Sequence, residues 1–182
     1  MAQPKYVRNG YVWIPAMEAG VSGLIGGPVM SIAANVALAP STTGNQILDF
    51  ITLPAGALEL PGQYIYLFAQ AVIVNNANSK TIAFNWGGTG AIGAAPTGGT
   101  TACTSTGTTV TSLQIEATIM KTGASTQDLV SVTSAAGAVY AAPVIATATV
   151  TDTANIQLNL LVNAATAASD VTSVRWFAQF NL

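Results

Sequence analysis

Strict alternation of apolar and polar residues over 112–120 is the feature that most constrains the fold of this chain. One series is Leu113, Ile115, Ala117 and Ile119, and the other is Gln114, Glu116, Thr118 and Met120. Side chains two residues apart lie on the same side of an extended backbone, so the pattern predicts a β-strand with one buried face. No apolar stripe of helical period persists over several turns anywhere in the chain.

Similar segments recur along the chain, and β-branched residues dominate them. We expect about ten short strands, at residues 10–14, 30–38, 45–53, 62–74, 80–86, 108–120, 126–135, 141–150, 155–165 and 171–182. Their spacing is close to that of a β-sandwich, and no internal repeat indicates a propeller or a solenoid. The sequence predicts an all-β, jelly-roll-like two-sheet sandwich with an extended N-terminal arm. We assign the arm to residues 1–28 and a single sandwich domain to residues 29–182.

Local patterns refine this prediction. Residues 62–74 are apolar on both faces, which predicts a central strand or one covered on both sides. The glycine-rich segment 87–109 is expected to form a flexible loop that faces solvent. The alternating strand is expected to turn at residues 122–124, with Gly123 at positive φ and the side-chain amide of Gln127 holding the backbone of the turn.

The tryptophans are expected to be core or interface anchors rather than ligand-stacking residues. In the last strand, Trp176 shares a face with apolar residues and is predicted to be buried, while Arg175 lies on the opposite face. Trp13 and Trp86 are expected to serve as similar anchors.

Charged residues make up 7% of the 182 residues, against roughly 25% in ordinary globular domains. The cations are Lys5, Arg8, Lys80, Lys121 and Arg175, and the anions are Glu18, Asp49, Glu59, Glu116, Asp128, Asp152 and Asp170. Because five scattered cations cannot form a basic groove, we expect no nucleic-acid partner. A soluble monomer with so few charges tends to associate, so we expect neighbouring molecules to cover much of the surface.

The apolar composition also raises the question of a membrane. The longest apolar run, residues 64–74, is well short of the ~20 residues that a membrane-spanning helix needs. An outer-membrane barrel would share the alternation and the low charge, but residues 1–13 lack the apolar core of a signal peptide. We therefore expect no membrane partner.

Few residue types suited to catalysis or metal binding are present. The chain has no histidine, and its single cysteine, Cys103, excludes an intrachain disulfide and a cysteine-based zinc site. Asp128, Asp152 and Asp170 match no calcium-binding loop, and we expect each to lie in a surface turn. The glycine motif at residues 87–93 lacks a P-loop lysine and precedes no helical pattern. We expect no enzymatic activity, no cofactor and no metal.

Five segments in their order along the chain resemble jelly-roll structural proteins of tailed bacteriophages. They are "ITLPAGALELPGQYIYLFAQAVI", "SKTIAFNWGGT", "SLQIEATIMKTGASTQDLVSV", "DTANIQLNLLVNA" and "VTSVRWFAQFNL". The resemblance is a pattern rather than a sharp motif and spans residues 45–182, with Leu113 at a position where that group often has an aromatic residue. It implies a jelly-roll fold, a place in the virion and a cyclic homotrimer.

Three functions fit these expectations. The first is a capsid decoration (cement) protein on the outer surface of a phage head, bridging subunits of the major capsid protein. The second is a tail or fibre component that binds a host receptor or glycan, and a weaker third is a trimeric ligand of the C1q or tumour-necrosis-factor type. Aromatic and basic side chains often anchor interfaces, so we expect the arm to contact capsid or subunits through Lys5, Tyr6, Arg8, Tyr11 and Trp13.

Overall fold

The computed structural model describes residues 44–136 and 141–181, together with the backbone of four short strands nearer the N-terminus. Those strands are β1 (Tyr6–Asn9), β2 (Val12–Pro15), β3 (Gly27–Pro28) and β4 (Ile32–Ala34). The other strands are β5 (Gln46–Leu53), β6 (Tyr64–Ile73), β7 (Lys80–Trp86), β8 (Thr100–Gly107), β9 (Ser112–Gly123), β10 (Thr126–Ala135), β11 (Val144–Ala148), β12 (Ile156–Ala164) and β13 (Val171–Asn181). A 3-10 turn, Ala168–Asp170, precedes β13.

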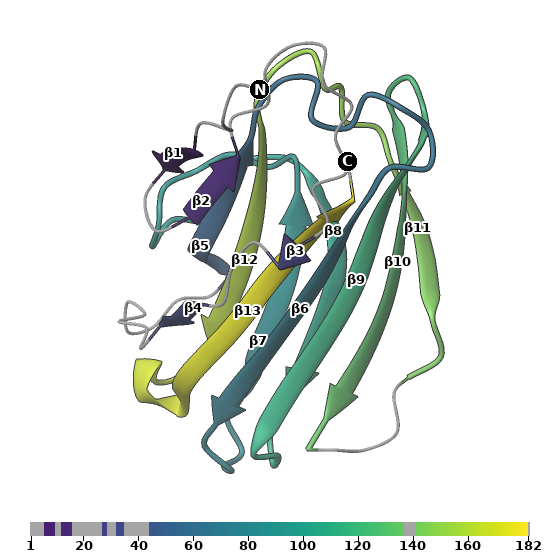
Figure 1. The fold of residues 1–182 in the computed structure, drawn as a ribbon. Coiled ribbons are helices and arrows are strands. Elements are labelled where there is room, and N and C mark those ends of the chain that lie inside the picture. The colour runs from purple at the N-terminus through teal and green to yellow at the C-terminus, as the bar shows by residue number, and fades with distance from the viewer. Residues whose placement is uncertain are drawn as a thin grey trace.

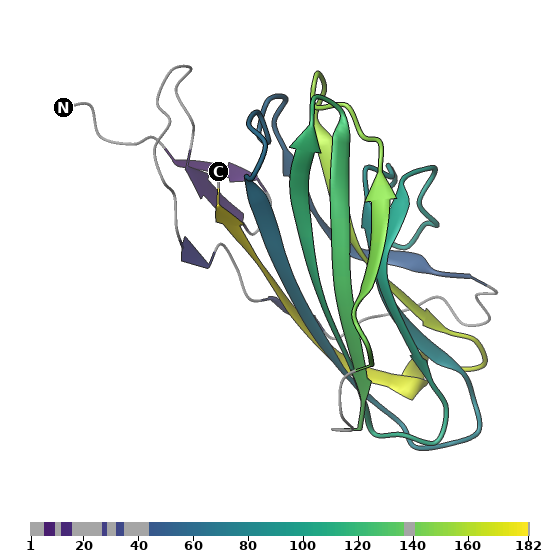
Figure 2. The same cartoon turned by 90° about the vertical axis from the view of Figure 1, so that its right-hand side faces the viewer.

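Two antiparallel sheets pack face to face (Figures 1 and 2). One has the strand order β11-β10-β9-β6-β13, extended beyond β13 by β3 and β4, and the other has the order β5-β12-β7-β8. The chain repeatedly crosses between the sheets, so that β5 pairs with β12 and β6 pairs with β13. The prediction of an all-β, jelly-roll-like two-sheet sandwich is confirmed.

The buried faces follow the alternation of the sequence. The inward series of β9, which begins at Leu113 and ends at Ile119, is at most 2% exposed. On β13, Trp176 is 3% exposed and its ring lies 6.1 Å from that of Phe84 on the opposite sheet. Trp86 is completely buried, whereas Arg175 is exposed. The predicted register of β9 and of β13 is therefore confirmed.

The prediction of a loop over residues 87–109 is wrong in its second half, because β8 occupies Thr100–Gly107. Its composition of Thr, Ser and Gly resembles a loop, and Ala102 and Cys103 are the apolar residues that it buries. β8 is nevertheless paired with β7 along its length, with Cys103 opposite Phe84. Backbone pairing to a strongly apolar neighbour thus overrode the weak strand signal of the segment itself.

The turn between β9 and β10 also differs from the prediction. Ala124 and Ser125 form it, and Gly123 is not at positive φ. The ammonium of Lys121 holds this turn: Nζ donates to the carbonyl of Ala124 at 2.8 Å and to the Asp152 carboxylate at 2.8 Å. Lys121 is 1% exposed, so its buried ammonium connects the turn to Asp152 at this end of the sandwich.

Gln127 lies inside the sandwich and does not bind the turn as predicted. Its amide nitrogen donates to the carbonyl of Val150 at 2.9 Å, and its amide oxygen accepts from the Val150 backbone N–H at 3.2 Å. The same oxygen accepts from the indole N–H of Trp86 at 3.2 Å. Gln127 therefore connects β10, β7 and the segment after β11 within the core.

The ammonium of Lys80 organises the opposite end of the sandwich. Lys80 is completely buried, and Nζ donates to Asn76 Oδ1 at 2.6 Å, the Asn78 carbonyl at 2.7 Å and the Thr108 carbonyl at 2.9 Å. Asp170 accepts from the side-chain amides of Asn76 and Asn78, both at 2.7 Å. Asp170 is 4% exposed, so its predicted place in a surface turn is wrong.

The buried Asp170 and the half-buried Asp49 have opposite pKa shifts. Hydrogen bonds from Asn78 and Asn76, with the nearby Lys80 ammonium, hold the pKa of Asp170 below its usual value in spite of burial. Burial raises the pKa of Asp49, although hydrogen bonds from Trp176 and the Phe50 backbone oppose the shift. Ionised Asp49 therefore opposes folding above its folded pKa, whereas ionised Asp170 favours folding above its unfolded pKa.

Replacement of Trp176 by Ala should lower the free energy of unfolding by about 3–5 kcal/mol, because it removes a large buried side chain. Arg175→Ala, one residue away on the exposed face, should change it by no more than about 0.5 kcal/mol. Urea denaturation of both variants measures the difference. A larger loss for Arg175→Ala would contradict the register of β13.

Asp170→Asn should lower the free energy of unfolding at pH 7 by about 1–3 kcal/mol, because Asn76 and Asn78 donate to different carboxylate oxygens and an amide nitrogen in place of one of them cannot accept. Wild-type stabilisation by this carboxylate is present above its unfolded pKa and is lost as the pH falls through its lower folded pKa. Urea denaturation at successive pH values should therefore show a shallower acid-induced loss in the variant. Asp128→Asn, the same charge change at a half-buried position, is the control. Equal acid sensitivity in the wild type and Asp170→Asn would contradict this role.

Candidate interaction surface

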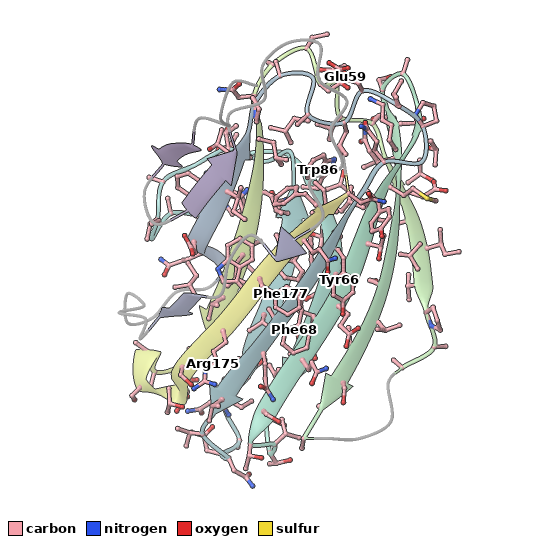
Figure 3. All side chains as sticks on the ribbon, in the orientation of Figure 1. Glu59, Tyr66, Phe68, Trp86, Arg175 and Phe177 are labelled. Atoms are coloured by element: carbon pink, nitrogen blue, oxygen red, sulfur yellow. The ribbon has the colours of Figure 1, made fainter. Side chains whose placement is uncertain are left out.

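The outer face of the five-stranded sheet carries an aromatic cluster, which we name the aromatic band: Tyr66, Phe68 and Phe177. The first two residues lie on β6 and the third on the neighbouring β13 (Figure 3). Phe68 and Phe177 are directly opposite in the register, and their rings stack with centroids 5.3 Å apart. The Tyr66 ring is tilted against Phe177 at 5.9 Å. All three side chains are half-buried, so part of each remains accessible to a partner.

Strand pairing brings the band together. Residues that alternate outward on β6 meet those that alternate outward on β13, because side chains of paired residues share a face. The same strands send Leu67 and Ala178, which are completely buried, into the core. β6 is central, as predicted, but its outer face is only partly covered: Val72 is 47% exposed.

A polar strip borders the aromatic band on β9. The Tyr66 hydroxyl donates to Glu116 Oε2 at 2.8 Å, and the Gln114 amide donates to Glu116 Oε1 at 3.1 Å. These bonds fix the Tyr66 ring and keep its hydroxyl satisfied without water. An apolar centre with a hydrogen-bonded polar border is the usual composition of a protein–protein interface.

Cations are scarce on the accessible surface of the described residues. Lys80 and Lys121 are buried, which leaves Arg175 as the exposed cation in residues 44–136 and 141–181. Arg175 lies on the outer face of β13, near the aromatic band (Figure 3). A surface of this kind gives little electrostatic repulsion between copies of the chain.

The glycine-rich loop over residues 87–99 lies on the opposite sheet. Gly93 and Ala94 exchange backbone hydrogen bonds with Ile47 of β5, both at 2.8 Å. The side-chain amide of Gln157 donates to the Gly90 carbonyl and accepts from the Gly90 N–H at 2.9 and 3.0 Å. Positive φ angles, such as that of Gly93, allow these close approaches. Residues 89–95 are exposed as predicted, but the loop is held to the sheet at several points.

The predicted arm residues are only partly within the described chain. Tyr6 and Arg8 lie on β1 and Trp13 lies on β2, which pairs with it so that Arg8 is opposite Trp13. Figure 2 shows β1 and β2 on the outer side of the five-stranded sheet, away from the four-stranded sheet. Lys5 and Tyr11 lie outside the described residues. The arm as an interface stays a prediction, as does the domain boundary at residue 28.

The aromatic band was not among the predicted site residues. The sequence did contain a signal for it, since Tyr64, Tyr66 and Phe68 alternate with buried residues in a segment that is apolar on both faces. The contribution of Phe177 depends on pairing between segments more than a hundred residues apart. Single-strand alternation carries no information on that pairing.

Comparisons with protein-family models, with curated proteins and with solved structures found no match. The resemblance to phage jelly-roll proteins therefore remains an expectation from the sequence pattern.

The described residues offer little that could carry out chemistry. No group of three or more His, Cys, Asp and Glu side chains that could hold a metal ion occurs among them. Burial raises the pKa of the Cys103 thiol to about 11, so the nucleophilic thiolate is scarce at neutral pH. In this part of the chain no helix is long and apolar enough to cross a membrane.

Phe68 and Phe177 should behave as one unit. In a double-mutant cycle with Phe68→Ala and Phe177→Ala, we expect a coupling of about 0.5–1.5 kcal/mol in the free energy of unfolding, because the two rings stack. Chemical denaturation of both single variants and the double variant measures it. The control cycle pairs Phe68→Ala with Phe50→Ala on the other sheet, and should be additive within about 0.5 kcal/mol. Additivity in both cycles would show that Phe68 and Phe177 do not stabilise one another.

Proposed function

We propose that this chain is a structural protein of a tailed-bacteriophage particle, a decoration (cement) protein that binds the outside of the head as a homotrimer. The aromatic band is the observation that carries the proposal. It supplies an apolar centre for contacts between copies, on a surface whose described part has a single exposed cation. A closed ring would cover such patches in every copy.

The N-terminal arm is the second element of the proposal. Its cations Lys5 and Arg8 and the aromatic residues Tyr6, Tyr11 and Trp13 are suited to a protein interface. In this arrangement, the arm binds the major capsid protein and the exposed loop over residues 87–99 faces solvent. Each arm contributes a modest free energy of binding to the shell. The ring as a whole binds more tightly, because its arms are linked and bind the shell together. Binding is non-covalent and strengthens the shell by linking neighbouring capsid subunits.

Deletion of residues 2–26 should abolish binding to heads while the sandwich still folds, since the deletion ends before β3. The assay adds purified protein to particles stripped of it and measures the bound fraction by sedimentation. Phe68→Ser combined with Phe177→Ser should reduce the trimer to smaller species in light scattering and weaken head binding through loss of multivalency. Phe50→Ser, on the other sheet, is the matched control.

Three results would contradict parts of the proposal. The first is a truncated protein that decorates heads as well as the full chain does, which would exclude the arm as the binding element. The second is a full-length protein that binds tails or cells but never heads, which would favour a receptor-binding or glycan-binding tail component instead. A wild-type monomer at micromolar concentration, with no trimer on the particle, would exclude the proposed ring.

A further inference from the structure

The sandwich has four sheet edges. Within the described structure, one of them is paired with further strands and another is bonded to a loop at one residue. At one end of the five-stranded sheet, β3 and β4 pair with β13. At one end of the four-stranded sheet, Ile47 of β5 forms two backbone hydrogen bonds with Gly93 and Ala94 of the glycine-rich loop. Unpaired edge strands expose free N–H and C=O groups, and proteins commonly cover them in these ways.

The other two edges are β8 and β11, and they differ in character. The exposed side chains of β8 are the threonines Thr101, Thr104 and Thr106, and a register shift interrupts its pairing with β7. Polar side chains and irregularities of this kind disfavour further strand addition. In β11, by contrast, Val144 and Ile145 are 60% and 70% exposed, although both are branched apolar residues.

β11 also lacks the charged residues that usually protect an edge. It pairs with β10 alone among the strands that the structure describes. Residues 129–151 contain no charged side chain, so neither β11 nor its flanks carry a lysine or a glutamate that would repel another strand. Pro143 precedes the strand, and the ion pair of Asp152 with the buried Lys121 follows it, which limits any pairing to a short segment.

We propose that β11 is the contact strand for a second copy of this chain, through antiparallel pairing of β11 with β11 about a twofold axis. The absence of charge favours this occupant, because a twofold contact places each residue near its own equivalents and a charged edge would repel itself. The pairing joins two five-stranded sheets edge to edge and covers Ile145 of both copies. This contact does not depend on the proposed function, because it uses a different surface from the aromatic band and the arm.

Replacement of Ile145 by Lys should break the contact with little effect on folding, since the side chain is largely exposed. We expect light scattering between about 1 and 100 µM to give a limiting mass for the wild type about twofold above that of Ile145→Lys. Ile92→Lys is the matched control, because Ile92 is also an apolar residue, 64% exposed, but lies in the glycine-rich loop. It should keep the wild-type mass. Far-UV circular dichroism and thermal melts check that both variants are folded.

Amide hydrogen exchange identifies the strand itself. In the wild type, the amides of Val144–Ala148 should exchange more slowly as the concentration rises, and in Ile145→Lys they should not. A wild-type mass independent of concentration and equal to that of Ile145→Lys would overturn the proposal. So would equal masses of Ile145→Lys and Ile92→Lys, or an association that leaves β11 exchange unchanged. Protection of β11 only after addition of phage heads would assign the edge to a capsid partner and overturn the second copy as its occupant.

Discussion

Two buried ammonium groups are the constraint around which both ends of the sandwich are built. The ammonium groups of Lys80 and Lys121 lose their bound water on folding. Hydrogen bonds to oxygen atoms of the loops replace that water. Because an uncompensated buried charge is strongly destabilising, those loops have little freedom to move away. The ends of the strands are thereby fixed, and the packing of the two sheets between them is fixed with them.

The burial of these two lysines also determines how little charge the surface carries. Burying Lys80 and Lys121 withdraws two of the chain's five cations from the surface. What remains on the described surface is polar but mostly uncharged, with the aromatic band on one sheet and the exposed β11 at its edge. The aromatic band is a face that the side chains of a partner can pack against. β11 is an edge that the backbone of a partner strand can extend. The two proposed contacts thus use different parts of the molecule.

The burial of a residue was predictable where its own strand determines it. The contacts of a residue were not predictable where its partners are distant in the sequence. Period-two alternation placed Trp176 in the core and Arg175 outside, because one strand suffices to define its own two faces. Asp170 and Gln127 looked like turn residues, since nothing within a few positions revealed that their partners come from distant parts of the chain. The aromatic band was missed for a related reason: Phe177 is its neighbour only after β13 has paired with β6.

The burial of Cys103 has a practical consequence. The chain has one cysteine, which is 3% exposed, and burial raises the pKa of its thiol to about 11. It will react slowly with thiol reagents as long as the protein is folded. A cysteine placed at any exposed position would therefore be the single reactive thiol of the native molecule. Spin labels, fluorophores or cross-linkers can then be attached at a chosen exposed position without prior removal of the native residue.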